Sequence, residues 1–139
     1  MHLHRIFTFV LAMSPAIGQT ADYPLEIIER FDDAKVVISI DERDIAAAPA
    51  WRPAEGEPPV NTAALVSAVR EWSARHPDLA QERIRKIELK PISRHEGQRH
   101  WYYLVKTKNP ADARAEPHYL AVMMDGKVLP AIREPSAYK

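Results

Sequence analysis

The segment IRKIELKPI (residues 84–92) carries the clearest structural signal in the chain, because apolar and charged side chains alternate along it. Ile87 and Leu89 are separated by charged neighbours, which is the period-two pattern of a β-strand with one buried and one solvated face. A second segment, RHWYYLVKT (residues 99–107), follows after a short polar stretch and is rich in aromatic and β-branched residues. We therefore expect two antiparallel strands joined by a turn.

The turn predicts the register of this strand pair. If residues 95–97 form the turn, Ser93 lies opposite Arg99. Because side chains alternate between the two faces of a sheet, the register then decides which side chains share a face. One face carries three opposed pairs: Ile87 with Val105, Leu89 with Tyr103, and Pro91 with Trp101. The charged residues Lys86, Glu88 and Lys90 lie on the other face.

Two further strands are expected near residues 118–124 and 127–132. Asp125-Gly126 lies between them and favours a two-residue type I′ hairpin turn, since both residues tolerate a positive φ. That turn would place Val128 opposite Met123 and Pro130 opposite Ala121. A simple loop over residues 108–116 would place Lys106 opposite His118.

Residues 62–76 have the pattern of an amphipathic helix. Asn61 or Thr62 is a suitable N-cap, because a short polar side chain can accept a hydrogen bond from the first turn. Leu65, Val69 and Trp72 form an apolar stripe at helical spacing, and the helix ends before Pro77. Helix and strands together form the predicted domain over residues 61–132.

The residues before this domain form a smaller front part. Residues 19–45 contain a segment at 24–32 that suits a short helix, although a strand fits its alternation too, and a β-branched strand at 35–41. Residues 46–60 contain four prolines and are expected to be an extended connector. The predicted fold class is therefore α+β: an antiparallel four-stranded meander with one main helix packed on one face, preceded by a short helix and strand, and followed by a tail at 133–139.

The first eighteen residues have the layout of a secretory signal peptide. A short region with one fixed positive charge, at Arg5, precedes an apolar stretch at residues 6–13 and then small residues. Eight helical residues span about 12 Å, against roughly 30 Å of hydrocarbon, so we expect no permanent membrane anchor. We expect cleavage after Gly18, or else after Ala16, and export to the periplasm or the medium.

Composition excludes several classes of function. The chain has 139 residues, equal numbers of basic and acidic residues, and no cysteine. The absence of cysteine removes disulfides, thiolate metal sites and cysteine nucleophiles. A net charge of zero argues against a nucleic-acid partner.

No motif in the sequence specifies chemistry. The histidines expected in the mature chain (His76, His95, His100 and His118) are spaced along different elements, so we expect no metal site. The acidic residues at 32–33 and 41–44 flank the expected strand at 35–41, and we interpret them as solvated strand ends. No serine lies in a nucleophile elbow. We expect no catalytic residue and no cofactor.

One helix cannot cover both faces of the meander. The predicted register puts the helix on the face that carries Ala121 and Met123, and leaves a second apolar face with a charged rim. The front part at 24–41 can cover this second face; the alternative is a homodimer or a protein partner. The candidate partner surface is therefore Tyr102, Leu104, Leu120, Val122, Met124 and Leu129.

Trp51 and Arg52 form a secondary candidate. Trp and Arg are frequent at interface hot spots, so an exposed Trp51 would be an anchor for a partner. Alternatively, Trp51 folds back into a groove and pins the connector to the domain.

The helix followed by a meander resembles a PepSY-type module, and also many small secreted bacterial proteins of unknown function. The resemblance covers about residues 60–132 and depends on Tyr103-Leu104-Val105 before Asp125-Gly126-Lys127-Val128. The chain departs from that pattern in its insert at 108–116 and in lacking a Thr-Gly after the last strand. The resemblance implies a non-catalytic exported module, sometimes an inhibitor or chaperone-like part of a peptidase, and supplies no catalytic residue. We thus expect an exported binding or interaction module; the alternative is a small secreted hydrolase with an unrecognised site.

Overall fold

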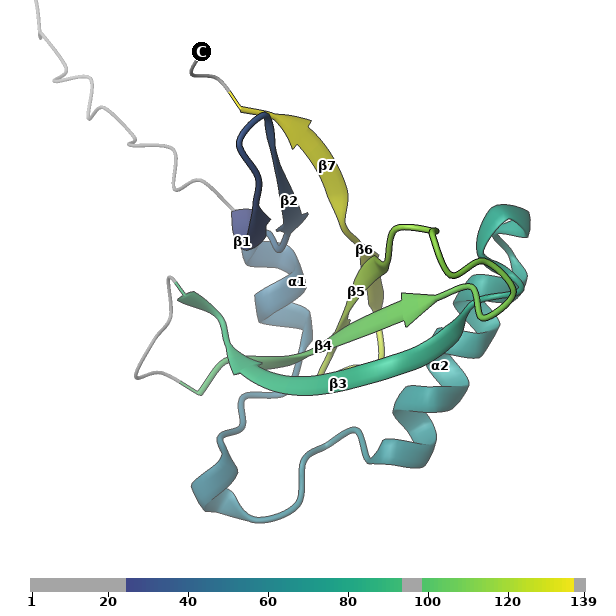
Figure 1. Cartoon of the computed structure of the whole chain (residues 1–139). Helices are drawn as coiled ribbons and strands as arrows, with labels where there is room; N and C mark the ends of the chain where they lie inside the picture. Colours follow the sequence, from purple (N-terminus) through teal and green to yellow (C-terminus); the bar gives the residue numbers. More distant parts are fainter. Residues whose placement is uncertain (1–24, 94–98, 137–139) are drawn as a thin grey trace, which may run out of the picture.

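Two antiparallel sheets and one main helix make up the structure, a computed structural model that describes residues 25–93 and 99–136 (Figure 1). This confirms the α+β class and the four-stranded meander. The front sheet has the order β1-β2-β7, and the meander has the order β3-β4-β5-β6. The strands are β1 (Leu25–Arg30), β2 (Ala34–Ser39), β3 (Arg83–Pro91), β4 (Trp101–Lys108), β5 (His118–Met123), β6 (Val128–Pro130) and β7 (Ile132–Pro135). The helices are α1 (Glu42–Ala47) and α2 (Thr62–Ala74), with short 3₁₀ turns at Pro53–Glu55 and Pro77–Leu79. The expected signal peptide (1–18) and the turn at 95–97 lie outside the described residues.

The first described element is a strand, so the prediction of a short helix at 24–32 is wrong and its strand alternative is right. β1 pairs with β2, which confirms the strand predicted at 35–41. The hairpin between them is closed by a hydrogen bond of 2.7 Å from the Phe31 N–H to the Ala34 carbonyl. Glu26 of β1 is buried, and its carboxylate accepts hydrogen bonds from the backbone and hydroxyl of Ser93 at 2.9 and 2.6 Å. A strand at this position connects the front sheet to the end of β3.

The acidic residues at 41–44 begin a helix, which sequence reasoning missed. Asp41 caps α1, and its carboxylate accepts hydrogen bonds from the N–H groups of Arg43 and Asp44, both at 2.9 Å. Asp44 in turn accepts from the Asp41 N–H at 3.2 Å, which completes a capping box. The hydrogen bond from the Asp44 N–H, above all, lowers the pKa of Asp41. Asp44 is buried and pairs with Lys127, so this cluster is not a solvated strand end.

The meander confirms one predicted register and corrects two. β3 and β4 pair as expected, with Ile87 opposite Val105 and Leu89 opposite Tyr103. β5, however, is offset by one residue, so that His118 lies opposite Thr107 and not Lys106. Along β6, Val128 lies opposite Val122, and Pro130 lies opposite Leu120.

The offset of β6 follows from the turn chemistry. The Gly126 N–H donates to the Met123 carbonyl, and the Met123 N–H donates to the Lys127 carbonyl, both at 2.9 Å. Gly126 has a φ of +87°, whereas none of the described non-glycine residues, Asp125 included, has a positive φ. The loop is therefore a type I turn followed by a left-handed glycine, with one more loop residue than the predicted type I′ turn.

Each side chain of β5 lies on the opposite face of the sheet from the one predicted, because a shift of one residue in the register moves every side chain to the other face. Leu120 and Val122 lie on the face that α2 covers, packed with Leu65 and Val69. Ala121 lies on the opposite face with Met123, Tyr102 and Leu104. The helix-side core is Val60, Leu65, Val69, Val105, Leu120 and Val122.

The second face of the meander is covered by the front part of the chain. Ile38 and Ile40 from the β2 region and Ile45 of α1 pack on this face, and all three are at most 4% exposed. The final residues, expected to be a tail from 133, instead form β7, which pairs with β2. Ala131 lies between β6 and β7, and its N–H donates to the Tyr119 carbonyl at 2.9 Å. One stretch of chain thus passes from the meander into the front sheet.

α2 confirms the predicted helix, although its main aromatic residue is less buried than expected. Asn61 is the N-cap, and its side chain accepts a hydrogen bond from the Ala64 N–H at 2.8 Å. Leu65 and Val69 are buried. Trp72 is only partly buried: it packs against this core and stacks on His76 with a centroid distance of 3.8 Å.

Leu65 is fully buried between α2 and the sheet, so truncating it should leave a cavity. We expect Leu65→Ala to lower the free energy of unfolding by about 2–5 kcal/mol, measured by urea denaturation. Ser67→Ala, at an exposed position of the same helix, is the matched control and should change it by less than about 0.5 kcal/mol. Equal stability of the two variants would contradict the packing of α2.

Candidate functional site

The residues of the predicted partner surface are buried or partly buried inside the protein. Tyr102, Leu104, Leu120, Val122 and Met124 are each at most 4% exposed, and Leu129 is partly buried. Tyr102 and Leu104 lie under the front part, whereas Leu120 and Val122 lie under α2. The prediction failed because the register of β5 was wrong by one residue, and because the front part covers the second face.

Trp51 is also not an exposed anchor. It is 6% exposed, and its backbone N–H donates to the Arg99 carbonyl at 2.9 Å. Arg52 is exposed, and its N–H donates to Glu55 at 2.9 Å. Glu55 accepts hydrogen bonds from the Arg99 guanidinium at 2.9 and 2.7 Å. The connector at 46–60 is therefore held to the start of β4, as the alternative interpretation of Trp51 required.

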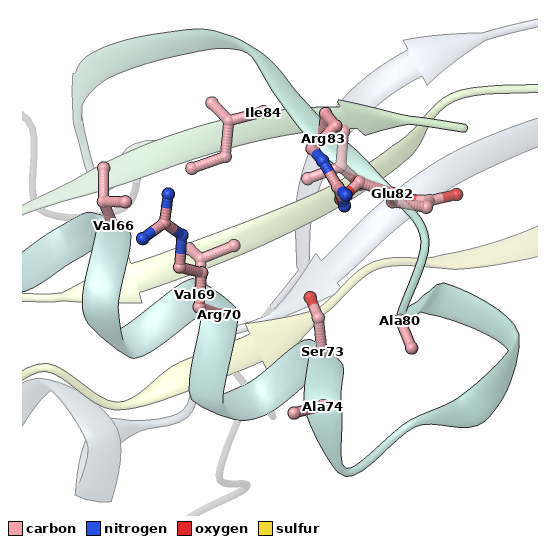
Figure 2. A pocket seen from close by; sticks show the side chains of 10 residues that line it. Val66, Val69, Arg70, Ser73, Ala74, Ala80, Glu82, Arg83 and Ile84 are labelled. Carbon is pink, nitrogen blue, oxygen red and sulfur yellow. The ribbon is translucent and has the colours of Figure 1, made fainter. Parts of the chain in front are cut away.

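A groove with a volume of about 720 Å³ lies between α2 and β3 (Figure 2). It forms because α2 packs chiefly against β5 and β6, at the other side of the meander from β3. Its apolar wall includes Val66, Val69 and Ile84, which belong to or border the helix-side core. The complete lining is Val66, Val69, Arg70, Ser73, Ala74, Ala80, Glu82, Arg83, Ile84 and Thr107. A volume of this size is typical of small-molecule sites.

A buried carboxylate lies in the lining of the groove. The Glu82 side chain is 5% exposed. One of its oxygens accepts a hydrogen bond from the Thr107 hydroxyl, and the other lies 2.5 Å from Nδ1 of His118. The two hydrogen bonds offset the desolvation of this carboxylate and fix the orientation of the His118 ring, which is half exposed.

Two arginines bring positive charge to the groove. Arg70 extends from α2 toward the strand that carries Ile84 (Figure 2), and within residues 25–93 and 99–136 its guanidinium has no hydrogen bond or ion pair. Arg83 is held more firmly, because its Nη1 donates to the carbonyls of Gln81 and Glu82 at 3.3 and 3.0 Å. Ser73 places a hydroxyl in the same lining.

Sequence reasoning singled out neither Glu82 nor Arg70. Arg70 follows Val69 on the helix and lies outside the stripe of Leu65, Val69 and Trp72, a position where charged side chains usually face solvent. Of the four histidines considered as ligands, His118 pairs with a carboxylate and His76 stacks on Trp72. The described part of the chain contains no cluster of three or more side chains arranged to hold a metal ion. Nor does any helix in that part have the length and hydropathy needed to cross a membrane.

The Glu55–Arg99 pair should make the docking of the connector sensitive to acid. The hydrogen bond from Arg99 holds the pKa of Glu55 below its usual value of 4.5, so its stabilising effect is complete above pH 4.5 and is lost as the pH falls through the lowered pKa. We expect the melting temperature of the wild-type protein to exceed that of Glu55→Gln at pH 7, and the difference to shrink below pH 4.5. Glu57→Gln, at an exposed connector position, is the control and should show no such difference. A pH-independent gap between wild type and Glu55→Gln would contradict the assignment.

Comparison with known proteins found no similar protein. No family model, no curated protein and no solved structure matches the chain.

Proposed function

We propose that the protein is exported and acts outside the cytoplasm as a small non-enzymatic binding module, with the groove between α2 and β3 as its ligand site. The observation that carries this proposal is the groove of about 720 Å³, whose apolar walls are bordered by charged and hydroxyl side chains. Ligand sites commonly combine an apolar lining with a few polar groups that orient the ligand. The PepSY-type resemblance, which implies a binding role in an exported module, is part of the same proposal.

The apolar walls supply the favourable energy for binding. Val66 and Ile84 are only partly buried although they border the core, so a ligand that covers them removes apolar area from water. Ala74 and Ala80 are small, and they leave space between the helix and the strand. The groove can therefore bind the apolar part of a small molecule without rearrangement of the core.

A secreted hydrolase is the second candidate, and one pair of side chains favours it. His118 is oriented through Nδ1 by Glu82, the arrangement that positions an imidazole as a general base. Ser73 lies in the lining of the same groove. No hydrogen bond joins Ser73 to His118 among the described residues, however, and both Glu82 oxygens are engaged. These contacts give Glu82 and His118 a structural role, and we therefore favour binding over hydrolysis.

Binding at the groove can be tested with Nile red, a neutral apolar dye whose emission rises in apolar surroundings. We expect saturable binding to the chain that begins at Gln19. Ala80→Trp, which fills the groove, should weaken binding at least tenfold. Ala63→Trp is the matched control, at an exposed position of α2 outside the lining, and should bind as the wild type does. Unsaturable binding, or equal affinity in both variants, would refute the groove as the site.

Export has its own test. When the full chain is expressed in a bacterial host, we expect it outside the cytoplasm with a mass that begins at Gln19, or at Ile17 if cleavage follows Ala16. An intact chain that begins at Met1 and stays in the cytoplasm would refute export while leaving the groove untouched.

A further inference from the structure

We propose that the ligand of the groove is an amphipathic monocarboxylate, with its apolar part against Val66, Val69 and Ile84 and its carboxylate on Arg70. This inference rests on the proposed binding function and adds the chemical class of the ligand. It follows from three features of the groove: an apolar wall, an arginine with no partner among the described residues, and a buried acid that limits the charge the site accepts.

The position of Arg70 defines where the anionic group binds. Its guanidinium lies at the edge of an apolar wall and makes no ion pair with any described residue. Arg99 and Arg133, by contrast, are paired with Glu55 and Glu116, so their guanidinium groups are already engaged. A guanidinium presents parallel N–H groups that match the two oxygens of a carboxylate. Arg70 is exposed, and a ligand that covers Val66 and Ile84 would remove water beside its guanidinium and so strengthen the pair relative to one in open solvent.

The remaining groups of the groove complete the recognition of the acid. The Arg83 guanidinium is held on two backbone carbonyls, so it adds positive charge at a fixed position. Ser73 lies one helical turn from Arg70 on the same face of α2, and its hydroxyl can donate to a bound oxygen.

Glu82 restricts the ligand to a single negative charge. The lining contains two arginines and one carboxylate, so its formal charge is +1 when His118 is neutral. Glu82 is buried in the same wall, and it repels a second negative charge more strongly than an exposed acid would. A monocarboxylate therefore balances the charge of the groove, whereas a phosphate monoester near its dianionic state exceeds it.

The test compares three ligands with the same ten-carbon chain and different head groups: decanoate, decanol and decyl phosphate. Each is titrated into the chain that begins at Gln19, by calorimetry at pH 7 below its aggregation threshold. We expect decanoate to bind at least tenfold more tightly than decanol, and more tightly than decyl phosphate. Arg70→Met should reduce decanoate affinity to that of decanol. Arg75→Met, at an exposed site of α2 outside the lining, should keep the wild-type preference.

The outcomes separate this inference from the proposed function. If decanol binds as tightly as decanoate and both displace Nile red, the groove is a binding site but the carboxylate assignment is wrong. Tighter binding of decyl phosphate, or an undiminished preference for decanoate in Arg70→Met, likewise overturns the assignment. If Nile red itself fails to bind saturably, the binding function is refuted first.

Discussion

The structure depends on the burial of β4 and β5 on both of their faces. β4 has Tyr102 and Leu104 on one face and Val105 on the other, and all three are at most 4% exposed. β5 is buried at each position from Tyr119 to Met123. Strands that are apolar on both faces require two covering layers. α2 supplies one layer, and the front sheet with α1 supplies the other (Figure 1). The groove is a consequence of this arrangement, because α2 packs chiefly against β5 and β6 and leaves the β3 side of the meander open.

The register could be predicted from the sequence for the strand that has one apolar and one charged face. Along β3, Ile87 and Leu89 alternate with charges, so a shift by one residue would exchange the apolar and charged faces of the strand, although Ile87 itself is 37% exposed. β5 (HYLAVM) is apolar at nearly every position, and its pattern therefore favours neither of two registers. The segment at 24–32 fitted both a helix and a strand, and pairing with β2 and burial of Glu26 decide between them. Asp125-Gly126 is compatible with two hairpin turns, and which one forms depends on how the strands pack.

The groove could not be predicted from the sequence, since its residues come from elements whose relative position is decided by packing elsewhere. The stripe of Leu65 and Val69 correctly identifies the buried side of α2, but not how far that helix lies from β3. Arg70 has the sequence context of an ordinary solvated residue on a helix. Glu82 lies just before a strand and becomes buried only because Thr107 and His118 lie beside it. A charged residue next to the last buried position of a helix is a weak indication of a ligand site, because many such residues face solvent.

The passage of residues 128–135 from one sheet to the other affects the order in which the chain can fold during synthesis. β2 is translated early, yet one of its two neighbours in the front sheet is β7, from the end of the described chain. Until the ribosome has released that segment, Val37 has no Ile132 opposite it, and one edge of β2 is open. Pairing between residues so distant in sequence makes folding slow. An open strand edge is also prone to incorrect pairing. The earliest part of the front sheet is thus completed late, and the nascent hairpin of β1 and β2 must stay free of other strands until β7 has been synthesised.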